Sequence, residues 1–130
     1  MSLKAKVKVR MPLAGEDVVY QYFKCIDSKD LGGILDLFDY DATVYEPFSN
    51  IKGGLKGRSS IEPFLKVALM ANTDLRRKIK IEKLSKPNAN RVVALITFEK
   101  GEKVKGKYTF GFEDDPTDGK KIKSLRIEFL

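Results

Sequence analysis

The 130-residue sequence contains no histidine and a single cysteine, Cys25. The absence of histidine excludes a Ser-His-Asp or Cys-His catalytic centre and any zinc site that uses imidazole ligands. Acid–base chemistry would therefore depend on carboxylates, tyrosines or lysines. A single cysteine excludes an intrachain disulfide. Because Cys25 lies in a stretch with helical periodicity and has no histidine to activate it, we expect a small, partly buried thiol.

Long apolar runs are also absent, so no membrane contact is expected. The first residues alternate between charged and apolar types, which is unlike a secretory signal peptide. Together with the single cysteine, this pattern predicts an intracellular, reducing location, and hence the cytoplasm. Nothing in the sequence implies a metal or redox cofactor.

The net charge of +7 is unevenly distributed along the chain. Residues 11–75 carry a net charge of −4, whereas residues 76–130 carry +7. Such a basic segment can attract nucleic acid or another polyanion. However, Lys103, Lys105 and Lys107 alternate with uncharged residues, as on the solvated face of a strand, and no aromatic–basic interleaving of the RNA-binding type is present. We therefore interpret the excess charge as exposed sheet and keep polyanion binding as the weaker alternative.

Hydrophobic periodicity predicts one α+β domain over residues 15–130, preceded at 1–14 by a basic tail or edge strand. The capping-box spacing Ser59-Ser-Ile-Glu62 marks the start of the last predicted helix. We expect three helices in the N-terminal part of the chain, packed on a curved antiparallel sheet. The predicted helices span 16–27, 30–38 and 59–71, and the predicted strands span 42–48, 76–84, 91–99, 103–113 and 121–129.

Glu46 is the first candidate for chemistry. Strand periodicity places it on the same face as Ala42 and Val44. If that face is buried, the carboxylate must be paired, protonated or at the edge of a cavity, because burying an unpaired charge is costly. Two interpretations stay open: Glu46 is a pocket base with a raised pKa, or it reaches water at a frayed strand end or pairs with Arg58 or Arg126.

Two tyrosines complete the candidate set. Tyr22 lies in the middle of the apolar stripe of the first helix, and Tyr108 lies on the aromatic face of its strand. Each ring should face the core, so each hydroxyl needs a partner, either a backbone carbonyl or a group in a cavity. One carboxylate facing two phenols would suit enolisation, in which the carboxylate moves a proton and the phenols hold the developing oxyanion.

The stretch Asp39-Tyr-Asp-Ala-Thr-Val-Tyr-Glu-Pro-Phe48, followed by Gly54-Leu-Lys-Gly-Arg58 and an apolar helix, resembles the nuclear transport factor 2-like superfamily. The upstream stretch Tyr22-Phe-Lys-Cys-Ile-Asp-Ser-Lys-Asp-Leu31 is similar to the first helix and turn of that superfamily. The likeness is to its ketosteroid isomerase and SnoaL-like polyketide cyclase branches in particular. The resemblance implies a cone-shaped α+β fold, a deep and mostly apolar pocket for a small-molecule ligand, and a homodimer.

The resemblance also implies roles for the candidate residues. In isomerase-like members, an acid directly before the proline of the strand motif shuttles the proton, and Glu46 occupies that place. A tyrosine of the first helix donates to the oxyanion, as Tyr22 would, while Tyr108 stands where a second, carboxylic donor is found. SnoaL-like cyclases often use histidine, which this chain lacks. We therefore expect a pocket protein that either moves a proton next to a carbonyl, with Glu46, Tyr22 and Tyr108 as catalytic residues, or binds a small ligand or protein without catalysis.

Overall fold

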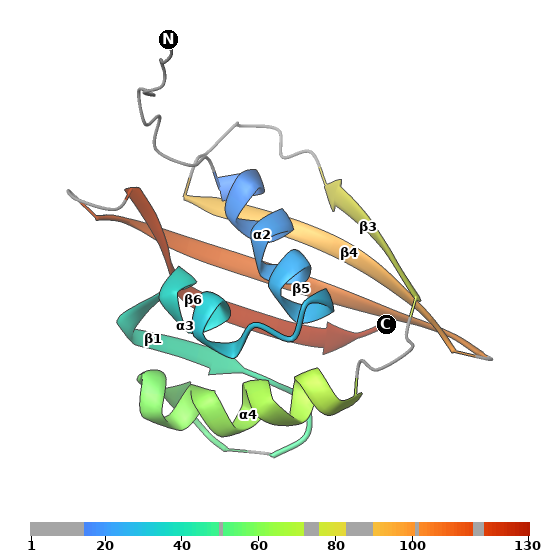
Figure 1. Cartoon of the computed structure of the whole chain (residues 1–130), viewed down its shortest axis with the longest axis horizontal. Helices are drawn as coiled ribbons and strands as arrows, with labels where there is room; N and C mark the ends of the chain where they lie inside the picture. The colour runs from blue at the N-terminus through green and yellow to red at the C-terminus, as the bar shows by residue number, and fades with distance from the viewer. Residues whose placement is uncertain (1–14, 50, 72–75, 83–89, 101, 116–118) are drawn as a thin grey trace, which may run out of the picture.

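The computed structural model describes residues 15–49, 51–71, 76–82, 90–100, 102–115 and 119–130. The predicted tail or edge strand over residues 1–14 lies outside the described residues. The described part is α+β, as expected, and its elements are shown in Figure 1. In chain order they are α2 (Gly15–Asp27), α3 (Leu31–Leu37), β1 (Phe38–Tyr45), β2 (Leu55–Lys56), α4 (Arg58–Ala71), β3 (Arg76–Glu82), β4 (Arg91–Lys100), β5 (Glu102–Asp115) and β6 (Gly119–Phe129).

The strands form one sheet in the order β2-β1-β6-β5-β4-β3. Neighbouring strands are antiparallel except β1 and β6, which are parallel, with Val44 opposite Leu125. The expectation of an antiparallel sheet is therefore wrong at this one pair. Strand periodicity places residues on faces but carries no information about the direction of a partner that lies some 80 residues away in sequence.

One boundary differs from the sequence prediction. Strand β1 begins at Phe38, so the residue expected to close the second helix instead opens the strand. Helix α4 follows β1 and β2, as the predicted ranges place it, so two of the three predicted helices, α2 and α3, precede the sheet. The two-residue strand β2 was not predicted, because a pair of residues inside a glycine-rich loop is too short to show a period.

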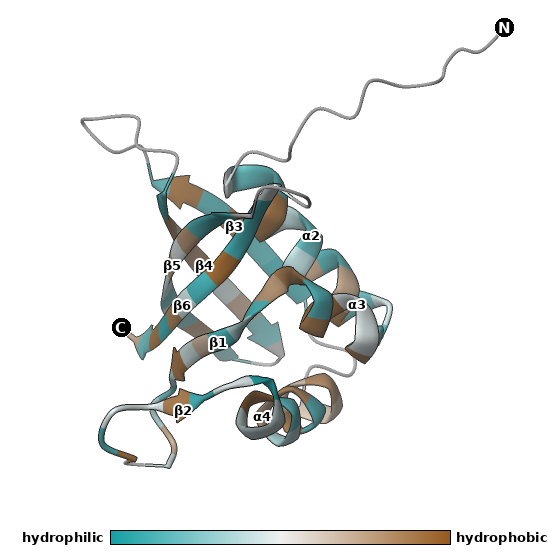
Figure 2. Cartoon of the chain, turned by 90° about the vertical axis from the view of Figure 1, so that its left-hand side faces the viewer, coloured by the Kyte–Doolittle hydropathy of each residue, from teal (hydrophilic) through white to brown (hydrophobic). Residues whose placement is uncertain are grey.

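Helices α2 and α3 lie over one face of the sheet, and α4 lies alongside β1 (Figure 1). Hydrophobic and hydrophilic residues alternate along the strands, as Figure 2 shows. The inward residues of the strands and the apolar stripe of α2 form one core, as the two periodicities predict. Its fully enclosed side chains include Val18, Val19, Ile34, Phe38, Ala42, Val44, Ile61, Leu65, Ala94, Phe110, Ile122 and Leu125.

The opposite face of β5 carries the basic residues. Lys103 and Lys105 are exposed and Lys107 is half-buried, while Tyr108 and Phe110 face the core. This arrangement confirms that the lysine alternation marks the solvated face of a strand. None of the helices among the described residues is long and apolar enough to cross a bilayer.

Candidate functional site

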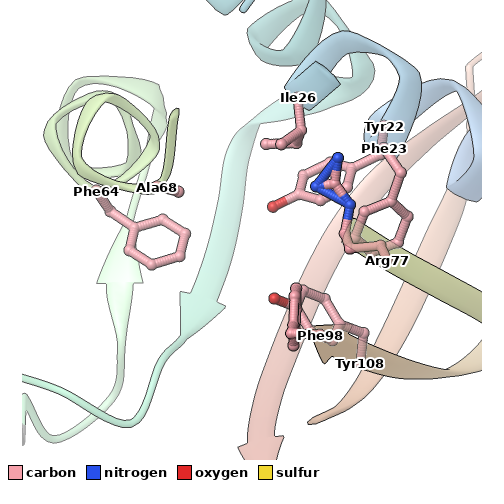
Figure 3. Close-up of a pocket in the computed structure, with 8 residues that line it drawn as sticks. All are labelled: Tyr22, Phe23, Ile26, Phe64, Ala68, Arg77, Phe98 and Tyr108. Atoms are coloured by element: carbon pink, nitrogen blue, oxygen red, sulfur yellow. The ribbon is translucent and has the colours of Figure 1, made fainter. Parts of the chain in front are cut away.

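A small pocket opens between α2, α4 and the strands β3 to β5 (Figure 3). About 260 Å³ within it is not filled by atoms, a volume that includes its opening to solvent. The enclosed part of the pocket is about 20 Å³, room for roughly one water molecule, so a larger ligand would extend into the opening. The lining residues are Tyr22, Phe23, Ile26, Phe64, Ala68, Arg77, Phe98 and Tyr108.

Helix α2 carries Tyr22 into the pocket on its buried stripe. The ring is packed edge-on against three phenylalanines, with centroid distances of 5.0 Å to Phe23, 5.5 Å to Phe110 and 6.3 Å to Phe38. Edge-to-face contacts of this kind restrict the orientation of an aromatic ring. The hydroxyl of Tyr22 is therefore held in one direction by the surrounding core.

Tyr108 reaches the same pocket from β5. Its ring centroid lies 5.4 Å from that of Phe23 and 6.3 Å from that of Phe98. The ring leans over Gly106, two residues earlier on the same face: a Cβ added there would lie 3.3 Å from Cε1 of Tyr108. The glycine thus leaves the space that this ring occupies, which is a common reason for a glycine inside a strand.

The two tyrosine hydroxyls point into the same gap, toward Phe64 on α4 (Figure 3). Neither hydroxyl makes a hydrogen bond within the described part of the chain. Every fully enclosed side-chain nitrogen or oxygen in that part has a partner, so these two hydroxyls must reach the open space of the pocket. They are polar groups in a wall whose other residues, apart from Arg77, are apolar.

Burial keeps both phenols neutral. It raises the pKa of Tyr108 to about 12, and it raises the pKa of Tyr22 further still. The positive charge of Arg77 lowers the pKa of both groups but does not outweigh burial. At neutral pH the two hydroxyls are therefore hydrogen-bond donors, suited to a carbonyl or carboxylate oxygen.

Arg77 was missed by the sequence analysis. Its side chain is only 5% exposed, forms an ion pair with the exposed Asp27, and places its guanidinium carbon 5.7 Å from the ring centroid of Phe23. A signal was available: Arg77 shares its strand face with Ile79 and Ile81, which pack against the core. An arginine on an apolar strand face must have a buried partner or a function there.

Glu46 does not line the pocket that contains Tyr22 and Tyr108. Its carboxylate accepts hydrogen bonds from the backbone N–H groups of Phe48, at 3.0 Å, and Ser49, at 3.1 Å, and from the Ser49 hydroxyl. Strand β1 ends at Tyr45, so strand periodicity no longer governs Glu46, and the turn that follows uses the carboxylate as its cap.

The two arginines considered as partners of Glu46 have other contacts. Arg58 donates to the carbonyl of Phe38 and lies over the ring of Tyr40. Arg126 lies over the ring of Tyr45. The structure thus brings together the two predicted tyrosines and leaves the predicted base outside their pocket. No cluster of three potential metal ligands is present among the described residues.

No protein-family model matches the sequence, and no curated protein matches it. Solved structures do match, at low sequence identity. An NTF2-like protein of unknown function from Cytophaga hutchinsonii is 14% identical, with a TM-score of 0.62 over 94% of this chain and 95% of that one. A ketosteroid isomerase-like protein from Erwinia carotovora atroseptica is 11% identical, with a TM-score of 0.65 over 90% and 94%. The epoxide hydrolase/cyclase-like enzyme SalBIII is 18% identical, with a TM-score of 0.65 over 89% and 90%. The chain therefore has the nuclear transport factor 2-like fold, as its sequence motifs indicate.

Proposed function

We propose that this protein binds a small molecule in the pocket between α2, α4 and the sheet, with the hydroxyls of Tyr22 and Tyr108 as hydrogen-bond donors. One observation carries the proposal: two phenols whose hydroxyls have no hydrogen-bond partner among the described residues open into one mostly apolar pocket. The remaining walls, including Ile26, Phe64 and Phe98, suit an apolar ligand body. Structural neighbours described as a ketosteroid isomerase-like protein and an epoxide hydrolase/cyclase-like enzyme support a small-molecule role, although the fold alone does not set the function.

The proposal is tested by ligand titration of the double variant Tyr22→Phe, Tyr108→Phe. With acetophenone as the probe, we expect binding to the wild-type chain and a loss of affinity of about tenfold for each hydroxyl removed. Amide chemical shifts would report both the affinity and the place of binding. The matched control is Tyr40→Phe, because Tyr40 is 72% exposed and lies outside the pocket. Equal affinity in the double variant, or shifts confined to another surface, would contradict the proposal.

Proton transfer next to a carbonyl is a second candidate. It is favoured by the same pair of phenols, which would stabilise an enolate oxygen better than the ketone from which it forms. The proton acceptor in this candidate is Glu46, whose carboxylate would have to leave the N–H groups of Phe48 and Ser49.

The variant Glu46→Gln separates the two candidates. If Glu46 is the base, exchange of the methyl protons of acetophenone in deuterated buffer falls to the buffer rate in this variant, while affinity stays within about twofold. The side-chain amide of the variant keeps an acceptor oxygen for the turn, so the fold should persist. Exchange at the buffer rate in the wild-type protein as well would leave binding without catalysis as the function, and equal rates above it in both proteins would show that Glu46 is not the base.

A further inference from the structure

Arg77 is the charged side chain of the pocket lining. Five of the eight lining residues are apolar, two are the neutral tyrosines, and no acid is among them. The guanidinium therefore gives the pocket a positive character that its two phenols reinforce, since both present their hydroxyl hydrogens. A pocket with a cation and two donors favours a ligand group that is negative and accepts several hydrogen bonds.

The ion pair with Asp27 does not cancel this character. Asp27 ends α2 and is 67% exposed, whereas Arg77 is 5% exposed. Water screens the charge of an exposed carboxylate, so its attraction for a buried cation is much reduced.

The positive charge of Arg77 interacts electrostatically with both tyrosine hydroxyls. It lowers the pKa of Tyr22 and of Tyr108, which means that it favours negative charge at each phenolic oxygen. An anionic oxygen placed next to these hydroxyls would lie in the same favourable field. The guanidinium carbon lies 5.7 Å from the ring centroid of Phe23, and Figure 3 shows Arg77 on the same side of the gap as Tyr22 and Phe23, across from Phe64.

We infer that the ligand of this pocket is a small monocarboxylic acid with an apolar body, whose carboxylate is bound by Arg77 together with the hydroxyls of Tyr22 and Tyr108. The inference rests on the proposed function and names the class of its ligand. A carboxylate suits the planar guanidinium fork. A dianion such as a phosphate monoester would bring a second charge that this single cation, which also pairs with Asp27, does not balance in a small and mostly apolar site.

The experiment compares phenylacetate with phenylacetamide, which has nearly the same shape and no charge. Amide chemical shifts of the full chain at neutral pH report both affinities. We expect phenylacetate to bind at least about tenfold more tightly than the amide in the wild-type protein. In Arg77→Gln the preference should disappear, chiefly through weaker binding of phenylacetate.

The matched control is Asp27→Asn, which breaks the same ion pair but leaves the guanidinium in place. Its preference for phenylacetate should be retained or increased.

If Arg77→Gln fails to fold, the wild-type preference and its persistence in Asp27→Asn still test the inference, because a preference lost with Asp27 alone would refute a role for Arg77. Equal binding of the two probes, or no binding of either while acetophenone binds, would overturn the inference and leave the proposed function standing. Failure of all three probes would count against both.

Discussion

Raising the pH from 10 to 12 is expected to remove several kcal/mol from the free energy of unfolding. In the unfolded chain a tyrosine loses its proton near pH 10, whereas burial raises the pKa of folded Tyr108 to about 12 and that of Tyr22 higher. Between these values the folded state retains protons that the unfolded state has lost, so stability falls as pH rises. Well below pH 10 both tyrosines are protonated in the folded and unfolded states, so neither contributes to the slope.

The expected size follows from the linkage relation. Each such tyrosine lowers the free energy of unfolding by up to about 1.4 kcal/mol per pH unit, so the two together account for roughly 5 kcal/mol by pH 12. That is comparable with the whole stability of many domains, which is about 5 to 15 kcal/mol. Urea unfolding followed by circular dichroism at several pH values would measure it.

The control for this prediction is the variant Tyr22→Phe, Tyr108→Phe. Lysines also titrate in this range, but they do so in both proteins, so the difference in slope isolates the two phenols. We expect the double variant to be markedly less sensitive to alkaline pH. An unchanged slope would mean that the two tyrosines are less buried in solution than the structure places them.

Phe110→Ala is expected to destabilise the fold by about 3 to 5 kcal/mol, the usual loss for a buried phenylalanine. The ring is fully enclosed, and its centroid lies 5.5 Å from that of Tyr22 and 6.3 Å from that of Tyr108. The cavity left behind would also remove a support that both site tyrosines share. We therefore expect weaker acetophenone binding in conditions where the variant remains folded. Chemical denaturation gives the stability change.

Phe129→Ala provides the matched control. Phe129 is 48% exposed on β6, where its ring centroid lies 5.5 Å from that of Phe48. An exposed side chain of this kind should contribute no more than about 1 kcal/mol. A similar loss in both variants would show that Phe110 is not the central ring of the core.

Local patterns account for most of the elements. The four-residue steps of Val18, Tyr22 and Ile26 predict both α2 and its buried face, because a helix brings such residues into line. The alternation around Tyr108 and Phe110 predicts β5 and its inward side in the same way. The parallel pairing of β1 with β6 and the short strand β2 have no such local signature, since both depend on where distant segments meet.

The residues of the candidate site likewise fall into those that local sequence patterns predict and those that they do not. Periodicity correctly sends Tyr22 and Tyr108 into the core, but it sends Glu46 inward as well, because nothing in the strand pattern reveals that β1 stops at Tyr45. A turn offers the Glu46 carboxylate two backbone N–H groups at once, and these local partners outweigh the continuation of the strand.

By itself, the sequence determined which chemistries are absent, which residues face inward, and that the fold is of the nuclear transport factor 2-like type. Those properties depend on composition, on periods of 2 and 3.6 residues, and on short motifs, all of which are local. Only the tertiary structure decided that Tyr22, Tyr108 and Arg77 share one pocket while Glu46 does not. These groups come from α2, β5 and β3, and their meeting depends on how a helix crosses a curved sheet, which no local pattern specifies.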